Sequence, residues 1–227
     1  NGDSFAPSIS ADGRFVAFAS TATNLVRADT NGATDIFVHD RDTGRTTRVS
    51  VASDGAQAGG DVFSPSISGD GQLVAFTSDA GNLVPGDANG ASDVFVHDRQ
   101  TGRTVVVSTA ADGSASDRGS FSPSLSTDGR SVAFTTDGAL VPGDTNGTED
   151  VFVYDLVRRA VGRVSLGADG SEGDRPSLSP SISRDATTVA FESLATNLVV
   201  ADTNVANDIF WRTGPDGNPA RPAEATR

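Results

Sequence analysis

One acidic loop sequence recurs four times in this chain and carries side chains that could hold a metal ion. Each copy has Asp, Asn and Asp at relative positions 1, 3 and 7, and three copies have Gly at position 4. This spacing directs oxygen atoms inward around a turn, and Ca²⁺ takes six to eight oxygen ligands in flexible geometry. We therefore expect a structural Ca²⁺ in each loop, with carbonyl groups and water completing its shell. The expected ligands are Asp29, Asn31, Asp35, Asp87, Asn89, Asp93, Asp144, Asn146, Asp150, Asp202, Asn204 and Asp208.

These four segments, called the first to fourth acidic loops below, also allow a simpler interpretation. Asp, Asn and Gly favour turns in which a side-chain oxygen caps the backbone, with no metal involved. Two carboxylates aimed at one centre repel each other without a cation, and this favours calcium over a turn alone. In the fourth loop Val205 replaces Gly, and a β-branched residue resists a positive φ, so we expect a weaker or empty site there.

The loops belong to a longer repeat. Phe5-Ala-Pro-Ser-Ile-Ser returns three more times, and the prolines Pro7, Pro65, Pro123 and Pro180 are spaced 58, 58 and 57 residues apart. A fixed period of this length indicates an array of one supersecondary unit. We expect a single domain over residues 1–227, with units at approximately 5–62, 63–120, 121–177 and 178–227.

Each unit contains signals for four short strands and none for a helix. In the first unit the strands are expected at 7–10, 14–20, 35–40 and 46–51, separated by turn sequences such as Asp12-Gly13 and Thr43-Gly44. The acidic loop lies between the second and third strands. Aromatic residues recur in those two strands, and we expect them to pack between sheets. They are Phe18, Phe37, Phe76, Phe95, Phe134, Phe152, Phe191 and Phe210.

The repeat resembles a known family. The run Ser-Pro-Ser-Ile-Ser-x-Asp-Gly, followed by Val-Ala-Phe and Asp-Ile-Phe-Val-x-Asp, is similar to the WD40-like (PD40) repeat of TolB-type β-propellers over the whole chain. The resemblance implies an all-β fold, a β-propeller of four four-stranded antiparallel blades. The acidic loops also resemble the calcium loops of FG-GAP repeats but lack their additional central Asp. Propellers serve as binding platforms, enzyme domains and spacers, so the fold alone does not assign a function.

A propeller must close its ring or hide its edges, and four blades is the lower limit for a closed one. We expect a compact four-bladed monomer. Two alternatives remain open at this point: two chains joined into a larger ring, or a chain that is part of a longer protein.

Charge and composition restrict the partners. The net charge of −13 argues against nucleic acid and against an anionic membrane surface. No segment is apolar for long enough to form a membrane-spanning helix, and the chain has no cysteine. The resemblance implies a secreted or periplasmic bacterial protein, for which a protein partner, a surface polysaccharide or a role as scaffold alone all fit.

Catalytic residues are not evident in the sequence. His39 and His97 occupy equivalent places in neighbouring units, where Tyr154 and Trp211 follow, so they do not form an unequal set around one centre. No nucleophile elbow, zinc spacing or phosphate loop is present. We therefore expect a non-enzymatic calcium-binding scaffold. The alternative is an accessory or catalytic propeller domain of a secreted enzyme that acts on carbohydrates or peptides.

Overall fold

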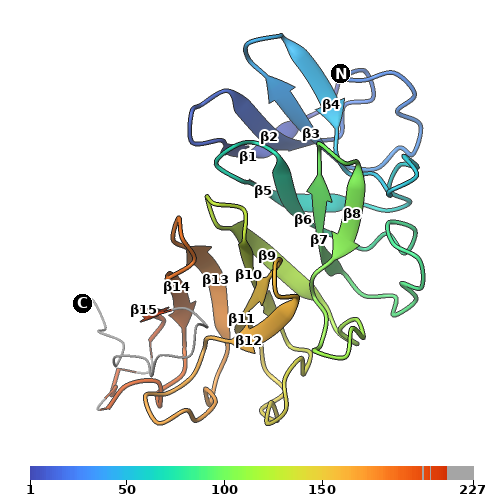
Figure 1. Ribbon diagram of the computed structural model, residues 1–227. Helices are drawn as coiled ribbons and strands as arrows, with labels where there is room; N and C mark the ends of the chain where they lie inside the picture. Colours follow the sequence, from blue (N-terminus) through green and yellow to red (C-terminus); the bar gives the residue numbers. More distant parts are fainter. Residues whose placement is uncertain (201, 205, 214–227) are drawn as a thin grey trace.

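The computed structural model describes residues 1–200, 202–204 and 206–213, and these form four antiparallel sheets arranged in an arc (Figure 1). The first sheet contains β1 (Ser4–Ile9), β2 (Phe15–Ser20), β3 (Asp35–Asp40) and β4 (Arg45–Arg48). The second contains β5 (Val62–Ile67), β6 (Leu73–Ser78), β7 (Asp93–Asp98) and β8 (Arg103–Val106). The third contains β9 (Ser120–Leu125), β10 (Ser131–Thr136), β11 (Asp150–Asp155) and β12 (Ala160–Arg163). The fourth contains β13 (Ser177–Ile182), β14 (Thr188–Ser193) and β15 (Asp208–Thr213).

The predicted all-β propeller fold is confirmed, and within each sheet the strands follow chain order. The last strand expected in the fourth unit lies outside the described residues. No helix in the described part of the chain is long and apolar enough to cross a membrane.

The first strand of every sheet is interrupted by a β-bulge at its proline. The register shifts between residues Phe63 and Ser66 in β5, and the equivalent shift occurs in the other three sheets. The residue before each proline has a positive φ of 49° to 53° although it is not glycine. Such a bulge twists a strand and re-aims its side chains. After the bulge, the hydroxyl group of Ser66 accepts a hydrogen bond from the Leu125 N–H in the next sheet, at 2.9 Å.

The core lies between consecutive sheets because alternate side chains of each strand point to opposite neighbours. In β6, Val74 and Phe76 pack towards the first sheet, whereas Ala75 packs towards the third. Seven of the eight predicted core phenylalanines are fully buried. Phe18 is half-buried because it lies in the first sheet, where no preceding sheet is present to cover it.

The expected closed ring is wrong for the described residues. Extensive contacts join only consecutive sheets, and the first and fourth sheets lie at opposite ends of the arc (Figure 1). The opening is also visible in side-chain exposure: Ile9 in β1 is 59% exposed, whereas its counterpart Ile67 in β5 is 6% exposed. Four repeats therefore form an open arc of sheets in place of the compact ring that we expected.

Candidate functional site

The acidic loops connect the second and third strands of each sheet and end on a buried aspartate. Asp35, Asp93 and Asp150 begin β3, β7 and β11 and are fully buried. Each carboxylate accepts a hydrogen bond from a serine hydroxyl just after the fourth strand, at 2.5 to 2.6 Å. These serines are Ser50, Ser108 and Ser165. A buried carboxylate must be hydrogen-bonded, and the neighbouring strand supplies that donor in three successive sheets.

The asparagine of each loop caps the turn. In the second loop, Asn89 Oδ1 accepts the backbone N–H of Ala91 at 2.9 Å, while Nδ2 donates to Asp93 at 2.7 Å and to the Ser116 carbonyl at 2.8 Å. The first and third loops repeat all three contacts. The amide nitrogen, and not the oxygen, therefore faces the buried carboxylate. This is the geometry of the alternative Asx-capped turn, and the role of Asn as an oxygen ligand of Ca²⁺ stays a prediction.

An arginine lies between the two carboxylates of the first loop. Arg48 Nη1 is 3.3 Å from Asp29 Oδ1 and 3.2 Å from Asp35 Oδ2, and all three side chains are largely buried. Arg48 Nη2 also donates to the Ala28 carbonyl at 3.4 Å. The guanidinium group thus supplies the positive charge that two converging carboxylates require.

The third loop has the same arrangement with one more acid. Arg163 Nη1 is 3.1 Å from Asp144 Oδ1, 3.3 Å from Asp150 Oδ2 and 3.0 Å from Glu172 Oε2. Glu172 also accepts two hydrogen bonds from Thr145, at 2.5 and 2.9 Å. These bonds, together with Arg163, lower the pKa of Glu172 to about 2.

The second loop has no arginine, because Val106 occupies the place of Arg48 and Arg163 at the end of the fourth strand. Within the described ranges, neither Asp87 nor Asp93 has a cationic partner within 4 Å. Burial raises the pKa of both carboxyl groups, and the charge on Asp87 raises the pKa of Asp93 further. The buried Asp93 and the half-buried Asp87 therefore lack the cation that the first and third loops contain.

The fourth loop is described only in part. Asp202 Oδ1 accepts the Asn204 N–H at 3.3 Å, and Asn204 Oδ1 accepts the Ala206 N–H at 2.8 Å. Asp208 begins β15 as expected and is half-buried. Val205, on which the expectation of a weaker site depends, lies outside the described residues.

These arrangements test how well calcium would fit. In the first and third loops the guanidinium group occupies the space between the carboxylates, and Ca²⁺ would have to displace it to reach oxygens at 2.3–2.6 Å. Among the three loops that the structure describes in full, only the second keeps two carboxylates free of an arginine. No three His, Asp or Glu side chains in the described part of the chain converge as a metal cluster, so carbonyl groups and water would supply the remaining ligands. Calcium binding stays a prediction, with the second loop as the best fit.

The other candidate residues are held by local contacts. His39 Nδ1 lies 3.0 Å from Thr46 Oγ1, and the buried His97 makes the same contact with Thr104 at 2.9 Å. Burial lowers the pKa of His97, so its imidazole is neutral at physiological pH. Trp211 is half-buried in β15, paired with Ala190. The two histidines belong to separate sheets and do not form one site.

Sequence reasoning missed the arginines and serines that complete the loops. Arg48 and Arg163 each precede a Val-Ser pair that ends the repeat, and Val106 stands in the same place in the second repeat. Aligning this position across the repeats would have identified the arginine as a recurring cation and shown that the second repeat lacks it. Glu172 carried no such signal, because the first repeat has Gln57 in its place, bonded to Thr30.

No family model and no curated protein matches the chain. Solved structures match it over almost its whole length. TolB from Acinetobacter baumannii aligns with a TM-score of 0.57 and 16% identity over 99% of this chain and 43% of its own. A putative TolB from Agrobacterium tumefaciens aligns with a TM-score of 0.58 and 17% identity over 93% of this chain and 58% of its own.

A third match is the β-propeller domain of the Trilobed protease from Pyrococcus furiosus, described as having an open velcro topology. It aligns with a TM-score of 0.54 and 12% identity over 100% of this chain and 57% of its own. The chain thus has the fold of TolB-type β-propellers, as the repeat predicted, and spans about half the length of these solved chains. Identities this low establish the fold alone.

Proposed function

We propose that this chain is a non-enzymatic β-propeller scaffold that presents its loops to a protein or polysaccharide partner outside the cytoplasm. The observation that supports it is the repetition of one internally satisfied network, Asp with Ser and Asn, in three successive sheets. A scaffold needs equivalent, rigid loops, whereas a reaction centre needs one unequal set of groups. The secreted or periplasmic location depends on the TolB-type fold, and the net charge of −13 disfavours a nucleic-acid partner.

The proposal includes one structural Ca²⁺, held in the second acidic loop by Asp87 and Asp93. In the first and third loops a guanidinium group lies between the equivalent carboxylates and supplies the positive charge. In the second loop Val106 stands in place of that arginine, so the positive charge has to come from elsewhere. With two carboxylates as its charged ligands, such a site has modest affinity, in the range of about 10⁻⁴ to 10⁻³ M.

Thermal unfolding of the EDTA-treated protein with and without Ca²⁺ tests this site. Calcium at about ten times its Kd stabilises the folded state by about 1.4 kcal/mol. For a domain of this size, that raises Tm by about 3–5 °C. We expect about one ion per chain, and a much smaller effect of Mg²⁺, which demands stricter octahedral geometry.

Two variants at one position make the test specific. Val106→Arg places in the second loop the side chain found in the first and third, and should abolish the response to calcium. Val106→Leu keeps an apolar residue there and should preserve it. About three ions per chain, or a response that survives Val106→Arg, would move the site away from the second loop. No bound ion would leave all the loops as capped turns.

A second candidate function is a propeller domain within an enzyme that acts on peptides or carbohydrates. The specific support is the structural match to the propeller domain of the Trilobed protease, which covers this whole chain. Incubation of the purified chain with casein and with acidic and neutral polysaccharides separates the two candidates. Catalytic turnover that survives further purification would favour the enzyme, whereas saturable binding without turnover would favour the scaffold.

A further inference from the structure

The two complete junctions between four-stranded sheets differ at equivalent positions. We call them the first junction, between the first and second sheets, and the second junction, between the second and third sheets. At the first junction the ring of Phe15 lies between two guanidinium groups, with Arg99 at 4.5 Å and Arg14 at 4.7 Å from its centre. Arg99 also donates to the Gly71 carbonyl. Charged and aromatic side chains therefore occupy this junction.

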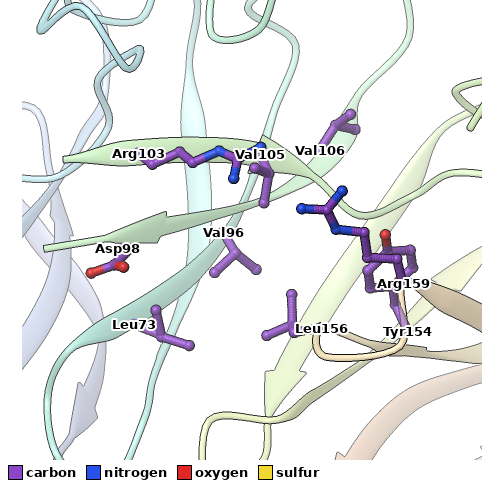
Figure 2. Close-up of a pocket in the computed structure, with 9 residues that line it drawn as sticks. All are labelled: Leu73, Val96, Asp98, Arg103, Val105, Val106, Tyr154, Leu156 and Arg159. Carbon is purple, nitrogen blue, oxygen red and sulfur yellow. The ribbon is translucent and has the colours of Figure 1, made fainter. Parts of the chain in front are cut away.

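The first junction has a cavity of about 230 Å³ whose lining includes Thr47 and Arg99, and the second junction has one in the equivalent place with aliphatic residues in its wall. Leu73 stands where the first junction has Phe15, Leu156 where it has Arg99, and Val105 where it has Thr47. The cavity has a volume of about 210 Å³, and its walls include Val96, Val106 and Tyr154 (Figure 2). This equals the liquid volume of about seven water molecules. The aliphatic part of its wall suits a short hydrocarbon group, such as a hexyl chain or a leucine side chain.

Two arginines lie at the mouth of this cavity. Figure 2 shows the guanidinium groups of Arg103 and Arg159 on the same side of the cavity, on either side of Val105, with Tyr154 next to Arg159. Neither side chain forms an ion pair or a hydrogen bond with any described residue. Their charges are available to an anion.

The backbone at Arg159 supports a role for its side chain. Arg159 has φ of +55°, whereas the equivalent turn residues of the first two sheets are Gly44 at +69° and Gly102 at +72°. L-residues other than glycine rarely adopt this left-handed conformation, and such strain is concentrated at functional positions. Glycine would satisfy the turn, so the arginine is present at a cost to the backbone.

We infer that the second junction binds a small amphipathic carboxylate, with its apolar group in the cavity and its carboxylate between Arg103 and Arg159. The guanidinium fork matches a carboxylate in charge and geometry. Asp98 lies away from Arg159 in Figure 2 and accepts the backbone N–H groups of Gln100 and Thr101 at 2.8 and 3.2 Å. Its negative charge favours a singly charged head group over a dianionic phosphate. This inference does not depend on the calcium site.

Titration of the EDTA-treated protein with hexanoate, followed by ¹H–¹⁵N NMR, tests the site. A ligand of this size should bind with Kd on the order of 1 mM. The shifted resonances should include Val105, Leu156 and Arg159. Hexan-1-ol is the uncharged control and should bind at least about tenfold more weakly, because it lacks the charge-assisted hydrogen bonds. Equal affinity for hexanoate and hexan-1-ol, or tighter binding of hexyl phosphate, would overturn the assignment.

Variants separate the two parts of the site. Arg159→Gly installs the residue that the other turns use, so the fold should be retained while hexanoate affinity falls about tenfold or more. Arg27→Gly removes a charge from an exposed position in the first acidic loop and should leave the affinity unchanged. Leu156→Asp places a carboxylate in the wall of the cavity and should abolish hexanoate binding, because it repels the ligand and removes apolar surface. Unchanged affinity in Arg159→Gly would refute the proposal.

Binding of two peptides tests whether the carboxylate belongs to a polypeptide C-terminus or to a free small molecule. N-acetyl-Ala-Leu with a free carboxylate and the same peptide with a C-terminal amide differ only in the charged head. Binding of the free acid at least as tightly as hexanoate, and loss in the amide, would identify the C-terminus of a polypeptide as the ligand. Binding of hexanoate alone would identify a free small carboxylate. Binding of neither would reject the site.

Discussion

The second acidic loop and its neighbours, the first and third, share one backbone and differ in charge. All three place a serine and an asparagine on a buried aspartate with nearly the same distances. In the first and third loops an arginine bridges the two carboxylates, and in the second it is replaced by Val106. The network of neutral donors is therefore sufficient to define the turn, because the turn persists without the arginine.

This difference shows what each part of the network contributes. The Asx cap and the serine hydroxyl satisfy the buried acceptor and fix the conformation that the first three repeats share. Burial raises the pKa of Asp87 and Asp93, and it also raises the pKa of Asp29, Asp144 and Asp150, which Arg48 or Arg163 lowers only in part. The charge can be balanced by a guanidinium group, by a proton or by a metal ion without change in the fold. The first three loops thus keep one conformation while the way that charge is balanced varies.

Removal of a bridging arginine should give the largest loss of stability. Arg163→Val leaves Asp144, Asp150 and Glu172 without their shared cation, and we expect a loss of about 3–5 kcal/mol in the free energy of unfolding. Arg48→Val leaves two carboxylates and should cost less. Urea denaturation in EDTA measures both losses. In each variant added Ca²⁺ should recover part of the loss, because the loop then resembles the second one.

Equal, small losses in Arg163→Val and Arg48→Val would contradict the role of the arginines. Arg130→Val is a suitable control, because Arg130 is exposed and its side chain makes no ion pair with the described residues. It should change stability by less than about 0.5 kcal/mol.

Neutralising the buried aspartate should cost less stability, and the loss should differ between the first and second loops. Asp35→Asn leaves the buried Arg48 with a single acidic partner, and we expect a loss of about 2 kcal/mol. Asp93→Asn removes a charge that has no cationic partner, so in EDTA it should change stability by less than about 1 kcal/mol. Urea denaturation of the two variants at pH 7 makes the measurement. The contrast fails if Asp93→Asn is the more damaging change.

The sequence predicted the parts of this structure that follow from local patterns. The proline period defined four sheets, and the phase of the aromatic residues located seven fully buried phenylalanines. Closure was not predictable in this way, because it depends on the angle between sheets, which the residues within one repeat do not specify. The half-buried Phe18 and the exposed Ile9 are consequences of that opening.

The acidic loops show a similar limit. Spacing brought Asp29 and Asp35 together correctly, yet it could not tell which atom of Asn31 faces Asp35, because O and N sit on the same side chain. The partner Arg48 lies on a different strand, 13 residues beyond Asp35, and a loop motif read alone does not include it. Residues that complete a site from a neighbouring strand are found only once the strand register is known.

The smallest predicted effect concerns pH and distinguishes Glu172 of the third loop from Asp87 and Asp93 of the second. Glu172 has a folded-state pKa of about 2, below its ordinary 4.5, so it binds fewer protons in the folded state. Its contribution to stability is present above pH 4.5 and is lost as the pH falls towards 2. Asp87 and Asp93 have raised pKa values, so their contribution has the opposite sign and grows as the pH falls. We expect Glu172→Gln to be less stable than the parent at pH 7 and equally stable near pH 2. Asp93→Asn should instead lose stability relative to the parent as the pH is lowered from 7. Urea denaturation across this range measures both differences, and parallel pH profiles for the two variants would show that the loops balance their charge in the same way.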